Sequence, residues 1–307
     1  MKKIFAILIA FGGSLVAYSQ QELLVSQYMF NGLMLNPAYA GTHAYFSANA
    51  LHRSQWVQFE KAPVSQVFSI DGPISNDKLG IGLLVHNDKL GVTSQLDASA
   101  NISYKLLLGS GKLSFGLRAG FSNYSAKLSE VVVWQSGDQV FERNDISGEF
   151  VPKFGFGMYY YTDSFYAGLS VPNIYSLDDN ILIEESQDEG YFEQHYYLNA
   201  GVVIESNTTL TIKPSILVKY VPSAPVEVDL NCNFMFFRKF WLGAGYRTGD
   251  ALIGMLEYNI TPQLSAGYAY DFTLTDIAEY SNGSHEVMVA YDFGKRIEIK
   301  TRSPRYF

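Results

Sequence analysis

The chain has 307 residues, a net charge of −8 and 17% charged residues, and the acidic balance disfavours a nucleic-acid partner, which needs a basic surface. Its single cysteine, Cys232, excludes an internal disulfide framework. Aromatic residues make up 15% of the chain and 22 of them are tyrosine, a composition suited to a surface that meets lipid headgroups.

The start of the chain has the organisation of a secretory signal peptide. Two lysines precede an apolar run over residues 4–17, and the small residues Ala17 and Ser19 occupy the −3 and −1 positions of a cleavage site. The run is too short to span a bilayer as a helix. We therefore expect residues 1–19 to be a cleaved signal peptide; the alternative is a buried N-terminal helix.

Residues 20–42 are apolar and rich in turn-forming residues, and they are too irregular to form a strand. This stretch predicts a periplasmic N-terminal segment or a plug inside a barrel. Its fixed structure is expected to come from Asn36, Pro37, Tyr39 and Gly41.

Residues 43–293 alternate between apolar and polar side chains in many runs of about ten residues, the length that a tilted strand needs to cross hydrocarbon. One face of each run carries large apolar and aromatic residues, and the other is rich in Gly, Ser and Asn with scattered charges. A soluble β-sandwich would also alternate, but it would expose mostly charged residues. The pattern predicts a transmembrane antiparallel β-barrel of about 14 strands with a polar lumen, least regular in the first two strands and the twelfth. The charged residues assigned to the lumen are Asp97, Arg118, Lys213, Asp229 and Asp271.

The connections between these strands support the same fold. The connections on one side of the predicted barrel are brief, whereas the other side carries the two longest connections, over residues 127–150 and 172–191. Short turns on the periplasmic side and longer external loops characterise outer-membrane barrels. An even number of strands predicts that both ends of the chain lie in the periplasm.

Three segments stand out as candidate binding regions. The first outer connection, expected to begin at His52, contains Arg53, Gln55 and Trp56, which suit docking of a partner or insertion into the lumen. An acidic stretch over 172–194 is a solvated loop or a docking surface for a cation or partner. The tail over 294–307 has five basic residues against one acidic residue, 5 − 1 = +4, and is expected to hang in the periplasm.

Motifs of catalysis are missing from the sequence. It contains no Gly-x-Ser-x-Gly elbow, no His-Glu-x-x-His and no phosphate-binding glycine loop, and its five histidines lack metal-ligand spacing. We therefore expect a non-enzymatic protein with no catalytic, cofactor-binding or metal site. An enzyme with a site built from external loops is a third hypothesis.

The irregular segments resemble the PorP/SprF family of type IX secretion and gliding-motility membrane proteins of Bacteroidetes. The matching pieces are residues 27–31, Leu35-Asn36-Pro37-Ala38-Tyr39-Ala40-Gly41, Arg53-Ser54-Gln55-Trp56 and Ser303-Pro304-Arg305-Tyr306-Phe307. The resemblance implies an outer-membrane barrel that supports export or surface attachment of a secreted cargo or adhesin, with periplasmic secretion components as further partners. It also places Arg305, Tyr306 and Phe307 among the candidate binding residues. The competing hypothesis is a passive, porin-like diffusion channel. Neither the cargo nor the choice between export and adhesin anchoring follows from the sequence.

Overall fold

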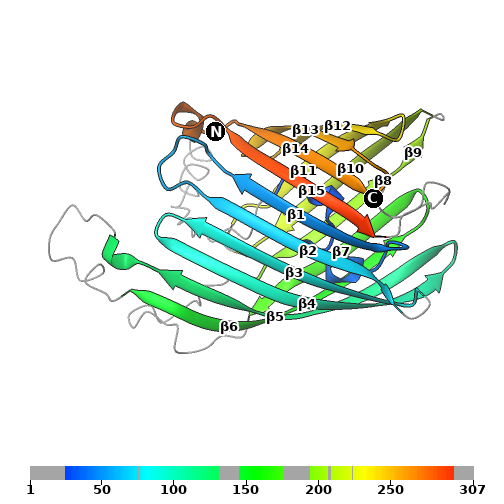
Figure 1. Cartoon of the computed structure of the whole chain (residues 1–307), viewed down its shortest axis with the longest axis horizontal. Coiled ribbons are helices and arrows are strands. Elements are labelled where there is room, and N and C mark those ends of the chain that lie inside the picture. The colour runs from blue at the N-terminus through cyan, green and yellow to red at the C-terminus, as the bar shows by residue number, and fades with distance from the viewer. Residues whose placement is uncertain are drawn as a thin grey trace, which may run out of the picture.

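The computed structural model describes residues 25–74, 77–130, 145–175, 194–206, 209–222 and 224–293, which form one antiparallel sheet rolled into a barrel (Figure 1). The strands are β1 Phe46–Ser54, β2 Val64–Ile74, β3 Leu79–Leu90, β4 Thr93–Leu108, β5 Gly111–Ala126, β6 Ile146–Tyr161, β7 Phe165–Tyr175, β8 Tyr196–Val202, β9 Ile204–Glu205, β10 Leu210–Tyr220, β11 Glu227–Phe236, β12 Phe240–Arg247, β13 Ala251–Asn259, β14 Leu264–Thr273 and β15 Ser284–Phe293. Both β8 and β9 pair with β10, so they are two parts of one strand interrupted at Val203, and the barrel has 14 strands.

The sheet closes on itself because β15 pairs with β1 as well as with β14. Phe46 at the start of β1 lies opposite Phe293 at the end of β15. Closure satisfies the backbone N–H and C=O groups that lipid cannot bind, whereas an open edge would leave a row of them unpaired. The 14-stranded barrel predicted from the sequence is confirmed.

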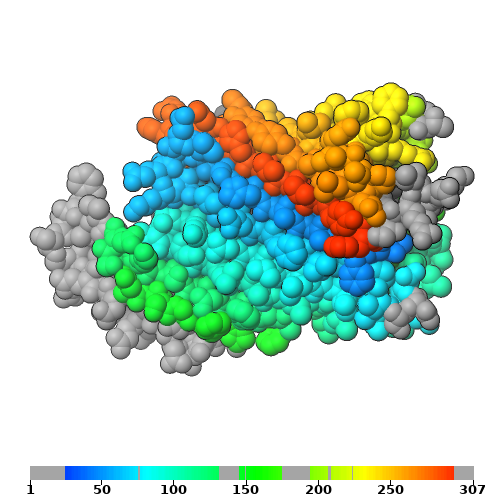
Figure 2. All heavy atoms as spheres, in the orientation of Figure 1, coloured from blue at the N-terminus to red at the C-terminus, as the bar shows by residue number. Residues whose placement is uncertain are grey.

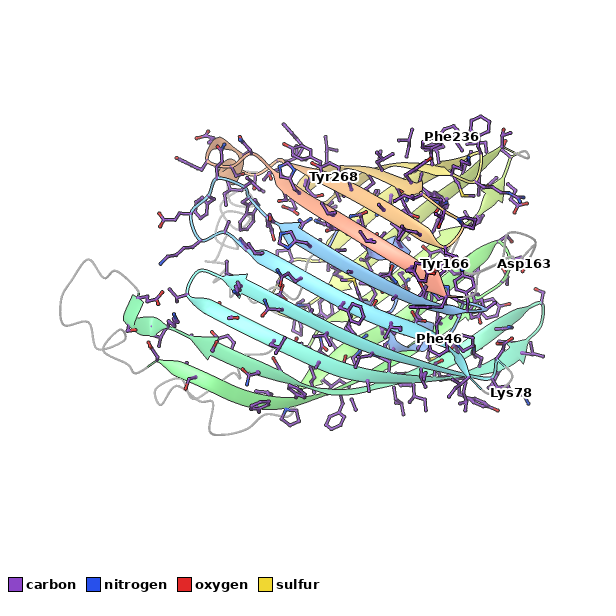
Figure 3. The ribbon with its side chains drawn as sticks, viewed as in Figure 1. Phe46, Lys78, Asp163, Tyr166, Phe236 and Tyr268 are labelled. Carbon is purple, nitrogen blue, oxygen red and sulfur yellow. The ribbon has the colours of Figure 1, made fainter. Side chains whose placement is uncertain are left out.

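Side chains alternate between the lumen and the outside as predicted. On β5, Leu117 is 59% exposed and its neighbour Arg118 is 4% exposed. All five charged residues assigned to the lumen are buried there. Figure 2 shows the outside over β15 and β1–β4 as a continuous wall of side chains, and Figure 3 shows side chains projecting from both faces of the sheet.

Several connections differ from those expected. Strand β1 extends to Ser54, so His52 and Arg53 lie in the sheet and the first outer connection begins at Gln55. The connection predicted over 127–150 is shorter than expected because cross-strand pairing continues, with Ala126 paired to Ile146. The connection predicted over 172–191 is shifted along the chain, because β7 reaches Tyr175 and β8 begins at Tyr196. Most of the acidic stretch over 172–194, the signal peptide and the tail over 294–307 lie outside the described residues.

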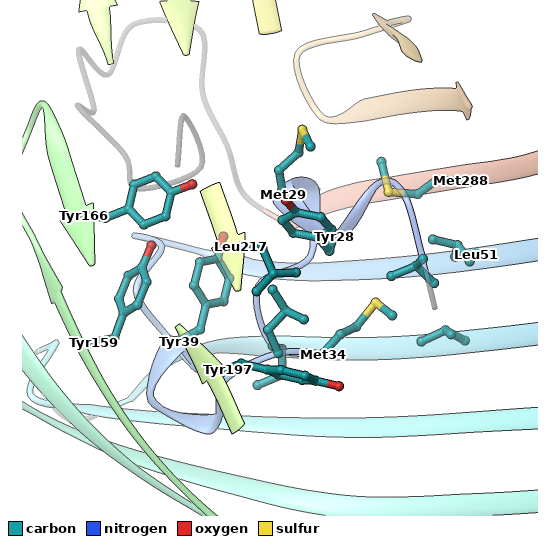
Figure 4. Packing of buried hydrophobic residues seen from close by; sticks show 14 of the residues in the cluster. Tyr28, Met29, Met34, Tyr39, Leu51, Tyr159, Tyr166, Tyr197, Leu217 and Met288 are labelled. Atoms are coloured by element: carbon teal, nitrogen blue, oxygen red, sulfur yellow. The ribbon is translucent and has the colours of Figure 1, made fainter. Parts of the chain in front are cut away.

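The lumen contains residues 25–42, which we call the luminal segment. It includes two short 3-10 turns, η1 Tyr28–Phe30 and η2 Pro37–Tyr39, and its apolar residues pack against inward-facing residues of the wall (Figure 4). Two more 3-10 turns, η3 Leu128–Glu130 and η5 Asp276–Glu279, lie in outer connections. No helix in the described part of the chain is long and apolar enough to cross a membrane.

The luminal segment runs lengthwise through the barrel. Gly41 lies near the short-turn end, where its backbone N–H donates to Asp71 (2.8 Å). Val25 lies toward the other end, where its carbonyl accepts from Arg247 at the outer end of β12 (3.3 Å). The first strand begins and the last strand ends at the short-turn end, whereas Val25 lies toward the outer end.

Candidate functional site in the lumen

The motif Asn-Pro-Ala-Tyr forms a capped turn that is bound to the barrel wall. The Asn36 side chain caps η2 by accepting from the N–H of Ala38 (2.9 Å), and Pro37 occupies the first position of the turn. The Asn36 amide also donates to the carbonyls of Met158 on β6 (2.9 Å) and Leu169 on β7 (3.3 Å). One side chain therefore fixes the turn and joins it to two strands.

Tyr39 and Gly41 hold the end of the luminal segment that leads into β1. Tyr39 is buried with its ring edge against Tyr159, 5.6 Å between centroids (Figure 4). Gly41 has φ +64°, which favours glycine, and a Cβ there would lie 2.6 Å from the Cα of Gly80. Both residues are therefore packed against the wall of the barrel.

Inward-facing glycines of the wall make room for the backbone of the luminal segment. A Cβ on Gly116 would lie 2.1 Å from the nitrogen of Ala38, and one on Gly157 would lie 1.9 Å from the side-chain oxygen of Asn36. Real Cβ atoms do not approach other atoms this closely, so the wall of β5 and β6 can carry no side chain at these points.

Charged residues of the wall satisfy backbone groups that the irregular segment leaves unpaired. Arg118 donates to the carbonyls of Leu33 and Met34, and Lys213 donates to the carbonyl of Met29 (3.4 Å). A buried polar group without a partner costs about 1–3 kcal/mol, and bonds to charged groups are the stronger ones. The inward charges that a water-filled pore would use to attract solutes here bind the chain's own backbone.

Five charged residues near the outer end of the lumen form a network that we call the outer cluster. Its members are Arg53, Asp229, Arg247, Asp271 and Glu286. Arg53 contacts Asp271 (2.7 Å) and Glu286 (3.2 Å), and Arg247 contacts Asp229 (3.0 Å) and Asp271 (3.4 Å). All five are at most 2% exposed. Buried charges are tolerated only when paired in this way.

The outer cluster binds the beginning of the luminal segment. The hydroxyl of Ser26 donates to Asp271 (2.8 Å), and the backbone N–H groups of Ser26 and Gln27 donate to Glu286 (both 2.8 Å). Arg53 in turn donates to the Ser26 hydroxyl (3.2 Å). Arg53 is therefore a lumen residue that holds the segment from inside.

The outer connection from Gln55 to Pro63 is a fixed part of the rim. The backbone of Gln55 bonds to Pro63 (2.9 Å), and Trp56 bonds through its N–H to the hydroxyl of Ser284 (3.1 Å). Three non-glycine residues in this connection, Trp56, Gln58 and Lys61, have positive φ. Such conformations cost about 1–3 kcal/mol each and persist where the surroundings enforce them. Arg53 and Trp56, expected to act together, point to the lumen and the rim respectively.

The structure thus brings Asn36, Pro37, Tyr39, Gly41 and Arg53 into one luminal assembly and places Gln55 and Trp56 at the rim. Arg305, Tyr306 and Phe307 lie outside the described residues. Sequence reasoning missed Arg247, Glu286 and Gly157 as partners of the luminal segment; the available signal was the excess of inward-facing charges and glycines. Among the described residues, no group of three or more His, Cys, Asp and Glu could hold a metal ion.

A family model described as "Type IX secretion system membrane protein PorP/SprF" matches residues 17–291. The chain belongs to this family. As a PorP/SprF protein with a closed 14-stranded barrel, it is a membrane component of the type IX secretion system and resides in the outer membrane. The match spans the luminal segment as well as every strand but the last residues of β15.

Solved outer-membrane barrels resemble this PorP/SprF protein only in a general way. Omp33 of Acinetobacter baumannii is 8% identical, covers 82% of this chain and 100% of its own, and has a TM-score of 0.48. A deletion mutant of the monoaromatic hydrocarbon channel TodX is 11% identical, covers 88% and 94%, and scores 0.48. The toluene transporter TbuX of Ralstonia pickettii is 9% identical, covers 86% and 92%, and scores 0.47. No curated protein matches the chain.

Proposed function

We propose that this PorP/SprF protein is a plugged outer-membrane barrel that docks a secreted partner at its outer rim, supporting export or surface attachment of that partner. The observation that carries the proposal is the luminal segment, which binds the wall all around the barrel. Its partners lie on strands β2, β5, β7, β10, β11 and β15. A segment bonded to opposite walls occupies the cross-section through which a solute or a polypeptide would have to pass.

A plugged barrel directs recognition to its two ends. The outer rim offers the strained connection that contains Trp56, with Phe59 46% exposed and Tyr280 of the neighbouring connection 68% exposed. Exposed aromatic side chains on a rigid backbone are characteristic of protein-binding sites. The backbone of Val57 bonds to both Asn282 and Gly283 (2.8 Å each), so the two connections form one platform.

The experiment replaces Trp56 by Asn, which tolerates its positive φ of 46°, and measures surface display and co-purification of the secreted partner from outer membranes. The matched control is Phe237→Asn, an exposed aromatic with φ 53° in the turn at the opposite end of the barrel. Because truncation of a central Trp costs about 2 kcal/mol or more, we expect a loss of about 30-fold for Trp56→Asn only. An equal loss in both variants would overturn docking at the outer rim.

The competing function, a passive diffusion channel, predicts a different measurement. Purified barrel in a planar bilayer should show a steady open conductance if it is a channel, whereas the filled lumen favours little or none. A steady pore in the unaltered protein would replace our proposal.

A further inference from the structure

A small cavity opens at the short-turn end of the barrel, on the side opposite the outer rim. Its volume is about 220 Å³, too small for a folded partner but sufficient for one side chain. Four parts of the chain line it: Gly41–Ala44, where the luminal segment leads into β1, the β2–β3 turn, the β4–β5 turn and the β6–β7 turn. Figure 3 shows Asp163, Lys78 and Phe46 at this end and Tyr268 at the other.

Two buried hydroxyl groups in the cavity lining lack a partner in the described part of the chain. Thr42 Oγ1 and the Tyr161 hydroxyl have no hydrogen-bond partner among the described residues, although the two residues are only 5% and 6% exposed. A buried hydroxyl without a partner costs about 1–3 kcal/mol, and such groups mark a missing ion, water or ligand. Both residues line the cavity.

The charged residues in the lining restrict the charge that a ligand of the cavity can carry. Lys105 donates to the carbonyl of Gly41 with one of its three N–H groups, and Lys112 lies beside it in the lining. Two ammonium groups with two unsatisfied hydroxyls favour an anion. Asp77 and Asp163 also line the cavity, and they disfavour a doubly charged group such as phosphate. The arrangement fits a single carboxylate that is flanked by basic residues.

One segment of the chain itself carries this chemistry. The tail over 294–307 contains a single acidic side chain, Glu298, within Lys295-Arg296-Ile297-Glu298-Ile299-Lys300. The tail begins directly after Phe293, which pairs with Phe46, two residues beyond Ala44 of the cavity lining. Five extended residues reach about 17 Å at about 3.3 Å each, so Glu298 can reach the cavity.

We propose that the periplasmic cavity is a carboxylate-binding site and that it takes Glu298 of the chain's own basic tail. The carboxylate accepts from Lys105, Thr42 and Tyr161, and the flanking lysine and arginine side chains lie against Asp77 and Asp163. Tethering gives the tail a high effective concentration at the site. This site is independent of partner docking at the outer rim.

Disulfide trapping in outer membranes tests the proposal on the full chain. In a Cys232→Ser background, Ser110→Cys on the cavity rim is combined with Ile299→Cys. The matched control combines Ile299→Cys with Pro262→Cys in the β13–β14 turn. This turn lies beside the end of β15, because the N–H of Asp292 donates to the carbonyl of Gln263 (2.9 Å). The two turns lie at the same end, and we expect the Ser110→Cys pair to form disulfide at least about tenfold faster. Equal rates would overturn the proposal.

Two further substitutions test recognition of the carboxylate. Adding Glu298→Gln should lower the rate of disulfide formation at Ser110→Cys by about tenfold, because one charge-assisted contact is lost. Glu298→Asp keeps the charge, so its rate should lie between that of Glu298→Gln and that of the unaltered tail. Tyr161→Phe should also lower the rate, because the ring remains in place and only the hydroxyl is lost. A rate that Glu298→Gln leaves unchanged overturns the assignment. So does capture of another membrane protein by Ser110→Cys in place of the tail, which identifies the occupant as an external partner.

Discussion

Adding one methyl group to Gly157 should release the luminal segment while leaving the barrel intact. The new Cβ would lie 1.9 Å from the side-chain oxygen of Asn36 and 3.1 Å from Pro37. Asn36 must then move, and it makes three hydrogen bonds where it is, to Ala38, Met158 and Leu169. The backbone at position 157 lies within a regular stretch of β6, so alanine is compatible with the strand itself.

The magnitude follows from these three bonds. Losing a buried hydrogen bond and leaving its partner unsatisfied costs about 1–3 kcal/mol, so displacement of Asn36, with its three bonds, costs about 3–9 kcal/mol. Since about 1.4 kcal/mol changes an equilibrium tenfold, the equilibrium between the bound and the released luminal segment shifts by a factor of about 10²–10⁶.

Protease protection of residues 25–42 and bilayer conductance measure this release. Gly157→Ala should expose the segment to protease and raise the conductance. The matched control is Gly254→Ala on β13, where an added Cβ meets no atom within 4 Å. The reasoning is refuted if Gly157→Ala keeps the protection and conductance of the unaltered protein, or if Gly254→Ala releases the segment equally.

Three other substitutions separate the wall from the segment. Leu117→Arg places a charge on the lipid face, which costs roughly 2–4 kcal/mol near mid-bilayer, and should greatly reduce the amount of barrel in heat-modifiability gels. Arg118→Leu should leave the amount of barrel normal. It should nevertheless increase hydrogen exchange of residues 33–36, because it removes the hydrogen bonds from Arg118 to the carbonyls of Leu33 and Met34. Arg53→Ala should leave the barrel in the membrane but destabilise the bound start of the luminal segment by about 3–5 kcal/mol, because Asp271 and Glu286 lose a buried cation. The measurement is faster hydrogen exchange at Ser26. Normal cargo display in this variant would show that Arg53 serves only the plug.

The alternating pattern carried most of the information on the barrel. It identified Leu117 as outward and Arg118 as inward because the side-chain period of a strand is two and lipid accepts no charge. The pattern is least regular in the first two strands and the twelfth, and for the twelfth, β13, the structure shows the reason. Ile253 and Met255 face inward and pack in the buried cluster, so both faces of that strand carry large apolar residues.

The arrangement of the lumen could not be predicted in the same way. Asn36 was recognised as part of a fixed turn, since Asn before Pro is a local signal. Its bonds to Met158 and Leu169, and those of Ser26 to Glu286, join residues 122 to 260 positions apart. No local preference specifies such pairs. The sequence therefore predicts a loop position for Arg53, whereas its carboxylate partners Asp271 and Glu286 lie in the last two strands.

The pairing of β1 with β15 joins the strands most distant in sequence. Its formation therefore has the largest loop-closure entropy cost, and we expect it to form late in folding. Arg53 and Glu286 face each other across this pairing, and Ser26 binds both. Binding of the start of the luminal segment therefore depends on completion of the cylinder. A barrel whose first and last strands have separated has also lost the contacts that hold the start of its plug, so a chain stalled before this step should be open-sided and loosened at Ser26.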